Sequence, residues 1–244
     1  MGLTATKAAK RAAPKSRGGR PTRDAAIERD QRLIDVATRL FLERGFDATS
    51  IDAVAEAARV SKPTVYAQYG DKRGLFAAVL RLEIARWLAP LAAATEMQVD
   101  CPSDGSIEQR LVDLGRQLLS ISCGTDAVAF GRILTAQAIN FPEIAKLAEE
   151  EGWSKAVSTT ARLFDQLVAA GALDVEDTTI AAEAFLNMVV GHTHRIATFG
   201  IPVDMKAAEK RMKLAIRLFL AGALGPPNRL PASPKTPVRR RPPR

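Results

Sequence analysis

Residues 60–76, VSKPTVYAQYGDKRGLF, concentrate cationic, hydroxyl and aromatic side chains that can bind a polyanion. Lysine and threonine near the start of a helix can reach phosphate oxygens and base edges. Tyrosine packs its ring against a protein surface and leaves a hydroxyl for a polar partner. Such a segment favours contact with nucleic acid, and the residues that would supply it are Lys62, Thr64, Tyr66, Tyr69, Lys72 and Arg73.

The rest of the sequence offers little for catalysis. It contains no Ser-His-Asp set, metal-binding cluster or glycine loop that cradles phosphate. His192 and His194 are two residues apart in a predicted helix, so they point to nearly opposite faces and do not suit one metal ion. Cys101 and Cys123 are expected to be reduced, as in a cytoplasmic protein. We therefore predict no enzyme, no metal and no cofactor.

The net charge of +8 is concentrated at the ends of the chain. Residues 1–23 carry seven Lys or Arg and no acid, and residues 226–244 carry six and no acid. Removing these thirteen charges from +8 leaves about −5 on the remainder. We expect a disordered basic arm at 1–23 and an extended, Pro/Arg-rich tail at 226–244, both able to contact a polyanion.

The composition predicts an all-α protein. Ala, Leu, Arg and Glu dominate, β-branched runs are scarce, and 47% of the 244 residues are hydrophobic, enough for a sizeable core. No apolar run approaches the roughly 18 residues of a membrane span, and the N-terminus lacks an apolar signal core. A cytoplasmic location, at the nucleoid if the protein binds DNA, and no membrane partner are expected.

Two helices are predicted ahead of residues 60–76. Apolar periodicity indicates a first helix from about Ile27, with Gly45 placed to end it in a left-handed conformation. Thr49 and Asp52 have the spacing of a capping box and predict the start of a second helix.

A third helix completes a helix-turn-helix. Ser61 can cap it, and Pro63 falls in its first turn, where a missing N–H costs little. The pair Ile51–Ala58 and Lys62–Gln68, joined by about three residues, fits the motif in which the second helix enters the major groove of DNA.

The remaining chain is predicted to form a helical bundle. A fourth helix begins after Asp71 and is expected to end at about Ala89, because Pro90 follows. Ser106 and Gln109 form a capping box for the next helix. The further amphipathic helices are predicted at 106–122, 126–138, 142–150, 153–170, 178–199 and 204–221.

The segment RLIDVATRLFLERGFDATSIDAVAEAARVSKPTVYAQYGDKRGLFAAVL resembles the DNA-binding domain of the TetR/AcrR transcriptional regulators. The matching motifs are A-x-x-L-F-x-x-x-G-F, T-S-I and V-S-K-x-T-V-Y-x-x-Y-x-D-K-x-x-L-F. The resemblance implies a homodimeric repressor that binds double-stranded operator DNA. Helix N-termini at 49–50 and 61–62 would add backbone donors for phosphate. The candidate DNA contacts are Thr49, Ser50, Lys62, Pro63, Thr64, Tyr66, Tyr69 and Lys72.

Three positions depart from the family pattern. Arg59 stands where glycine is usual, so a positive φ is expected there at a cost of roughly 1 kcal/mol. Tyr69 replaces a commoner phenylalanine, and Arg73 replaces an acid. These departures concern the fine geometry and the preferred DNA sequence.

The second half is similar to the regulatory domains of AefR-like members, through FPEIAKLAEEEGWSKAV and LVAAGALDVEDTTIAAEAFLNMVVG. The resemblance implies that the last long helices of two subunits form a four-helix bundle. Alanines at 181, 182 and 184 would permit close helix approach.

A small apolar or aromatic effector is expected between the helix of Trp87, the helix of Leu111–Ile121 and the helix that starts at Trp153. A regulatory ligand must touch the helix that continues from the DNA-binding head, and Trp87 lies on that helix. Gln137 is a further possible polar contact, and the alternative is a dry, packed core. The candidate ligand residues are Trp87, Leu91, Gln117, Leu118, Phe130, Trp153 and His192.

The predicted organisation is thus an N-terminal three-helix helix-turn-helix domain followed by a helical-bundle effector and dimerisation domain. The expected bounds are 1–23 for the arm, 24–88 for the DNA-binding domain (helix-turn-helix 51–70), 89–225 for the ligand-binding and dimerisation domain, and 226–244 for the tail. Two other functions stay open: an architectural DNA-binding protein without an effector, and a helical enzyme with a vestigial DNA-binding head.

Overall fold

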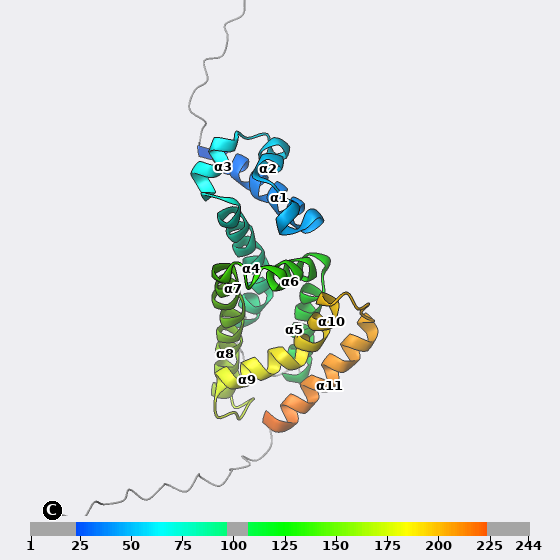
Figure 1. Ribbon diagram of the computed structural model, residues 1–244. Helices are drawn as coiled ribbons and strands as arrows, with labels where there is room; N and C mark the ends of the chain where they lie inside the picture. Colours follow the sequence, from blue (N-terminus) through cyan, green and yellow to red (C-terminus); the bar gives the residue numbers. More distant parts are fainter. Residues whose placement is uncertain (1–22, 97–106, 224–244) are drawn as a thin grey trace, which may run out of the picture.

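The computed structural model describes residues 23–96 and 107–223, and all regular secondary structure within those ranges is helical. This confirms the all-α prediction. A small head of three helices lies at one end and a larger helical body at the other, with helix α4 running between them (Figure 1). The predicted arm (except for Arg23), the tail and Cys101 lie outside the described residues.

The head consists of α1 (Arg23–Ala48), α2 (Ile51–Ala58), α3 (Lys62–Tyr69) and the first turns of α4 (Lys72–Glu96). Three aromatic rings join α1 to α4, with Phe41, Phe46 and Phe76 packed at centroid distances of 5.1 to 5.9 Å. Gly45 interrupts α1 with a φ of 79°, a conformation that glycine adopts without steric cost. The chain thereby turns so that Phe46 points back into the core, where it is 4% exposed.

The N-terminal cap of α3 is the predicted residue, whereas the N-terminal cap of α2 is a different one. Ser61 accepts a hydrogen bond from the Thr64 N–H at 3.3 Å, as predicted. The cap of α2 is Ser50, which accepts from the Ala53 N–H at 3.1 Å. The predicted Thr49 cap is therefore wrong, because that side chain is buried against the end of α1. Arg59 has the expected positive φ, 57°.

Helix α4 continues through Pro90 to Glu96, so the predicted stop before the proline is wrong. Proline removes one backbone hydrogen bond from a helix, and packing beyond it offsets that loss. Leu91 is 2% exposed, and the Thr95 hydroxyl reaches the carbonyls of Leu91 and Thr159 at 2.9 and 3.3 Å. The helix consequently crosses the predicted domain boundary at residues 88–89.

The body contains nine helical segments within the described residues, close to the predicted ranges. One π-helical segment follows α7 and joins the predicted stretches 142–150 and 153–170, and another follows α9 within the predicted stretch 178–199. The segments are α5 (Ile107–Ser122), α6 (Thr125–Gln137), α7 (Pro142–Leu147), η1 (Ala148–Trp153), α8 (Ser154–Ala169), α9 (Thr178–Leu186), η2 (Asn187–Gly191), α10 (His192–Thr198) and α11 (Met205–Ala223).

A second core holds the body together around Phe164 and Phe185, both fully buried and 5.5 Å apart. Helix α11 packs closely on α5, where a methyl group added to Gly115 would lie 2.8 Å from the Met212 sulfur. No single described helix has both the length and the apolar character to cross a membrane; together α5 and α6 reach both, but they are bent by 61°.

Candidate nucleic-acid interface and ligand cavity

The outward face of α3 presents a small set of polar side chains. Tyr66 is 44% exposed, and Lys62 and Pro63 are also exposed. The Lys62 ammonium lies 2.7 Å from an Asp52 carboxylate oxygen and 5.9 Å from the centre of the Tyr66 ring. Hydrogen bonding to Asp52 raises the pKa of Lys62, so this side chain stays cationic at the surface.

The start of α3 is ordered by its own cap. The Ser61 and Thr64 hydroxyls are 2.7 Å apart, and Thr64 is partly exposed. Ser50, at the start of α2, is exposed as well. The structure therefore brings five of the predicted DNA contacts to the surface around these two helices: Ser50, Lys62, Pro63, Thr64 and Tyr66.

The other three predicted contacts bond to residues of α1. Thr49 is 1% exposed, and its hydroxyl lies 3.0 Å from the Leu40 carbonyl and 2.8 Å from the Gly45 carbonyl. The Lys72 ammonium donates to the Asp47 carbonyl at 3.2 Å and lies 4.5 Å from the centre of the Phe46 ring. A base or phosphate contact through the Thr49 hydroxyl is incompatible with this burial.

Tyr69 faces α1. Its hydroxyl donates to Asp30 Oδ1 at 2.5 Å, and the Gln68 amide donates to the same oxygen. Burial, followed by the hydrogen bond to Asp30, raises the pKa of Tyr69 far above its ordinary value. Asp30 therefore fixes the last turn of α3 against α1. No local sequence signal indicates this bond, because its partners are 39 positions apart.

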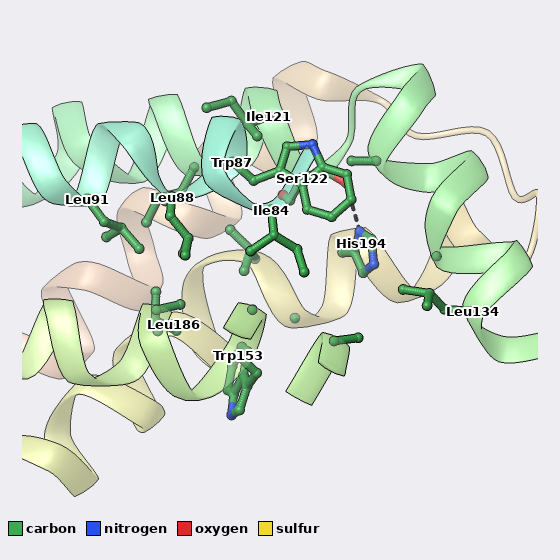
Figure 2. Close-up of a pocket in the computed structure, with 18 of the residues that line it drawn as sticks. Ile84, Trp87, Leu88, Leu91, Ile121, Ser122, Leu134, Trp153, Leu186 and His194 are labelled. Carbon is green, nitrogen blue, oxygen red and sulfur yellow. Dashed lines mark hydrogen bonds between the residues drawn. The ribbon is translucent and has the colours of Figure 1, made fainter. Parts of the chain in front are cut away.

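A cavity of about 320 Å³ lies in the body, below the head. Its walls come from α4, α5, α6, η1, α8, α9, η2 and α10, and Figure 2 shows Trp87 and Trp153 on different walls. The cavity has the predicted position, and four of the predicted ligand residues line it: Trp87, Leu91, Leu118 and Trp153.

The other candidate ligand residues do not line the cavity. Phe130 is fully buried against Phe76 and Trp87, at centroid distances of 6.0 and 5.7 Å. Gln117 is exposed on another face of α5. The Gln137 amide donates to Asp47 Oδ2 at 3.0 Å, so it is used between body and head.

His194 takes the place that was expected for His192. His194 lines the cavity, and its Nδ1 lies 2.7 Å from the Ser122 carbonyl oxygen (Figure 2). The π-helical segment η2 precedes both histidines and changes the angular register of everything after it, because π-helical bonds enclose one more residue than α-helical bonds. A regular helical projection across residues 178–199 therefore misplaces the two rings.

Both π-helical segments contribute to the cavity. Ala148, Gly152 and Trp153 of η1 and Val190 and Gly191 of η2 are in its walls. Such segments widen a helix locally and occur frequently at functional sites. The two π-helical segments therefore help to shape this space.

The body also contacts the head through the residues between α6 and α7, which meet Arg73 in the first turn of α4. The Arg73 guanidinium lies 3.9 Å from the centre of the Phe141 ring and 3.4 Å from a Glu143 carboxylate oxygen. Phe141 packs on Phe46 at 5.2 Å. Together with the Gln137–Asp47 bond, these contacts join the end of α6 and the start of α7 to the head.

Comparison with known proteins assigns both halves of the chain. Residues 33–79 match the family described as bacterial regulatory proteins, tetR family, and residues 109–222 match the AefR-like transcriptional repressor C-terminal domain. The chain belongs to the TetR family. The first match covers the helix-turn-helix, and the second covers most of the walls of the cavity.

Curated proteins and solved structures that match the chain are transcriptional regulators. The repressor ComR of Escherichia coli is 39% identical over 99 residues, which are 41% of this chain and 42% of ComR. This chain thus spans less than half the length of that curated relative. A TetR-family regulator from Mesorhizobium loti superimposes with a TM-score of 0.74 at 25% identity, over 82% of this chain and 98% of the other.

A further solved structure is the flavonoid-responsive regulator FrrA. It is 30% identical, has a TM-score of 0.64, and the alignment covers 80% of this chain and 96% of FrrA. These named relatives are regulators, which agrees with the expectation of a regulator and no enzyme.

Thr49→Val should lower the stability of the protein without lowering its affinity for DNA. Valine keeps the shape but removes the hydroxyl that bonds the end of α1, so we expect a loss of about 1–2 kcal/mol in the free energy of unfolding. DNA affinity of the folded protein should stay within twofold of the parent. Urea unfolding and fluorescence anisotropy with bound DNA measure the two quantities, and a large loss of affinity at unchanged stability would reinstate Thr49 as a contact.

Proposed function

We propose that the protein is a homodimeric transcriptional repressor that binds operator DNA through α3 and is released by a small apolar effector. The observation that carries this proposal is the path of α4. This helix supplies Phe76 to the core of the head, and its Trp87 and Leu91 line the cavity. A molecule in the cavity therefore touches the element that sets the tilt of the head.

The DNA-binding part of the proposal rests on the outward residues of the head. In a helix-turn-helix the second helix lies in the major groove, where side chains near its start reach base edges and phosphates. From the outward face of α3, Thr64 and Tyr66 would contact bases or phosphates, and Lys62 would exchange Asp52 for a phosphate oxygen. The basic arm at 1–23 and the tail at 226–244 would add non-specific attraction. The site of action would be the nucleoid, in the cytoplasm.

Helix α6 provides a second connection, besides α4, between the cavity and the head. Helix α6 contributes Ala127, Gly131 and Leu134 to the cavity wall, and its last residue, Gln137, bonds Asp47 of the head. A ligand that displaces α6 would therefore shift the head as well as α4. Release follows if the ligand favours a state whose heads no longer match half-sites about 34–36 Å apart.

The dimer part rests on an unusual apolar surface along α11. Leu214 is 50% exposed and Leu218 is 69% exposed, one helical turn apart. Ile180 of α9 is 65% exposed, and α9 and α11 are adjacent through Phe185 and Phe219 at 5.5 Å. Exposed apolar residues gathered on neighbouring helices suit a two-fold interface in which the same surface serves both subunits.

The name of one similar protein supports an aromatic effector. FrrA, at 30% identity over nearly its whole length, is named for its response to flavonoids. The cavity of this protein has two tryptophans in its walls and lacks lysine, arginine, aspartate and glutamate. An apolar, ring-containing molecule is the class that we propose here.

Thr64→Ala and Tyr66→Ala should each weaken operator binding by about 1–3 kcal/mol, through loss of a base-edge or phosphate contact. An operator is first selected from random duplexes, and affinity is then measured by fluorescence anisotropy. Thr135→Ala, in the exposed face of α6, serves as the matched control and should bind like the parent. If both head variants also bind like the parent, α3 does not read this operator.

Leu218→Glu should dissociate the dimer, because a carboxylate would be buried between two subunits. We expect the dimer dissociation constant to rise at least about a hundredfold, and operator affinity to fall with it. Sedimentation velocity measures the first quantity. Ile139→Glu is the control, since Ile139 is 93% exposed outside this surface and its substitution should leave the assembly intact.

Effector binding should change the emission of the two tryptophans in the chain, since both line the cavity. In a screen of apolar and aromatic compounds, those that shift the emission should lower operator affinity about 5–150-fold. Ala156→Phe fills part of the cavity and should abolish both responses while retaining operator binding. A compound that releases DNA from this variant as from the parent would place the effector site elsewhere.

A further inference from the structure

The cavity wall has very few polar side chains, and their hydrogen bonds restrict what can bind there. Ser122 and His194 are its only residues with polar side-chain atoms other than the two indoles. The Ser122 hydroxyl donates to the Leu119 carbonyl at 3.3 Å. The Ser122 hydrogen is thus used within the protein, and the His194 ring is the strongest hydrogen-bond acceptor among the side chains of the wall.

The Ser122 carbonyl fixes the tautomer of the His194 ring. A carbonyl oxygen only accepts, so at 2.7 Å Nδ1 must carry the hydrogen. In the neutral imidazole the other nitrogen, Nε2, then has a free lone pair and accepts. A backbone carbonyl thus sets the hydrogen-bonding character of the atom on the opposite side of the ring.

Nothing in the described part of the chain donates to this nitrogen. A methyl group added to Gly131 would lie 3.4 Å from Nε2, so the glycine leaves room beside it on the cavity wall. The Thr198 hydroxyl, also 3.4 Å from that methyl position, donates at 2.9 Å to the backbone carbonyl of His194. An acceptor without a donor next to an apolar cavity favours a ligand that supplies one O–H group.

We propose that the cavity binds a phenol-class ligand, with its hydroxyl donating to His194 Nε2 and its ring and alkyl substituent packed against the apolar walls. The proposal rests on the proposed function in taking this cavity as the effector site. A ring suits the walls, because Trp87 and Trp153 offer aromatic surface. The volume of about 320 Å³ is at the lower end of the range for small-molecule sites, so a one- or two-ring compound fits best.

The same walls disfavour an anionic ligand. A carboxylate taken out of water needs a cation or several donors, and the wall contains no lysine or arginine. The neutral ring tautomer presents Nε2 as an acceptor, which repels carboxylate oxygens. A phenol satisfies the acceptor without bringing a charge into the cavity.

The test compares matched probes on the purified full-length protein without DNA. The probes are para-propylphenol, its methyl ether para-propylanisole, which lacks the O–H, and para-propylbenzoate. We expect the phenol to bind about tenfold more tightly than the ether, the effect of one hydrogen bond to a site that is otherwise unsatisfied. The benzoate should bind more weakly than the phenol. Isothermal titration calorimetry gives all three dissociation constants.

Variants assign the preference to the ring nitrogen. His194→Asn can keep a donor to the Ser122 carbonyl but has no counterpart of Nε2, so the phenol should lose its advantage over the ether. His192→Asn makes the same change at a residue outside the cavity wall and should keep the advantage. Circular dichroism and thermal unfolding show whether each variant is folded.

The proposal is overturned by equal binding of phenol and ether by the parent, by no measurable binding of the phenol, or by a preference that survives in folded His194→Asn. Tighter binding of the benzoate would also contradict it. These outcomes are separate from the proposed function, because operator binding and its release by other compounds are measured with DNA in a different assay.

Discussion

Helix α4 belongs to both hydrophobic cores, and this shared membership is the constraint on which the rest of the structure depends. Its first turns bury Leu75 and Phe76 in the head, while Leu91 is buried in the body. Because close-packed cores resist small shifts, a change in the position of α4 at one end must be accommodated at the other. The continuation of the helix through Pro90 is what allows one rigid element to reach both cores.

The cavity interrupts the packing between these two cores. Leu88 contacts both of them, and the neighbouring Ile84 and Trp87 line the empty space. Glycines and π-helical segments keep side chains out of it, at positions where regular helices with larger residues would fill the gap. The fold thus leaves an unfilled volume next to α4, where a bound molecule would most directly shift the helix that positions the head.

Several polar side chains of the head make bonds to α1. Thr49, Tyr69 and Lys72 use their polar atoms on Gly45, Asp30 and Asp47. The Tyr69–Asp30 bond holds α3 against α1, and the Lys72–Asp47 bond joins the start of α4 to the end of α1. The outward set is consequently small, and each of its members should matter individually to operator affinity.

The sequence alone determined what depends on neighbours in the chain: the helices and their approximate ends, the Ser61 cap, the positive φ of Arg59, and the outward residues of α3. These follow from periodicity and local hydrogen bonds. Only the tertiary structure decided what depends on distant partners. The Tyr69–Asp30 bond joins residues 39 positions apart, and burial of Phe130 requires the head to pack on α6. His194 rather than His192 lines the cavity because of a π-helical turn before it and a bond to the Ser122 carbonyl, 72 positions away. A regular helical pattern in the sequence indicates neither the π-helical change of register nor the distant partner.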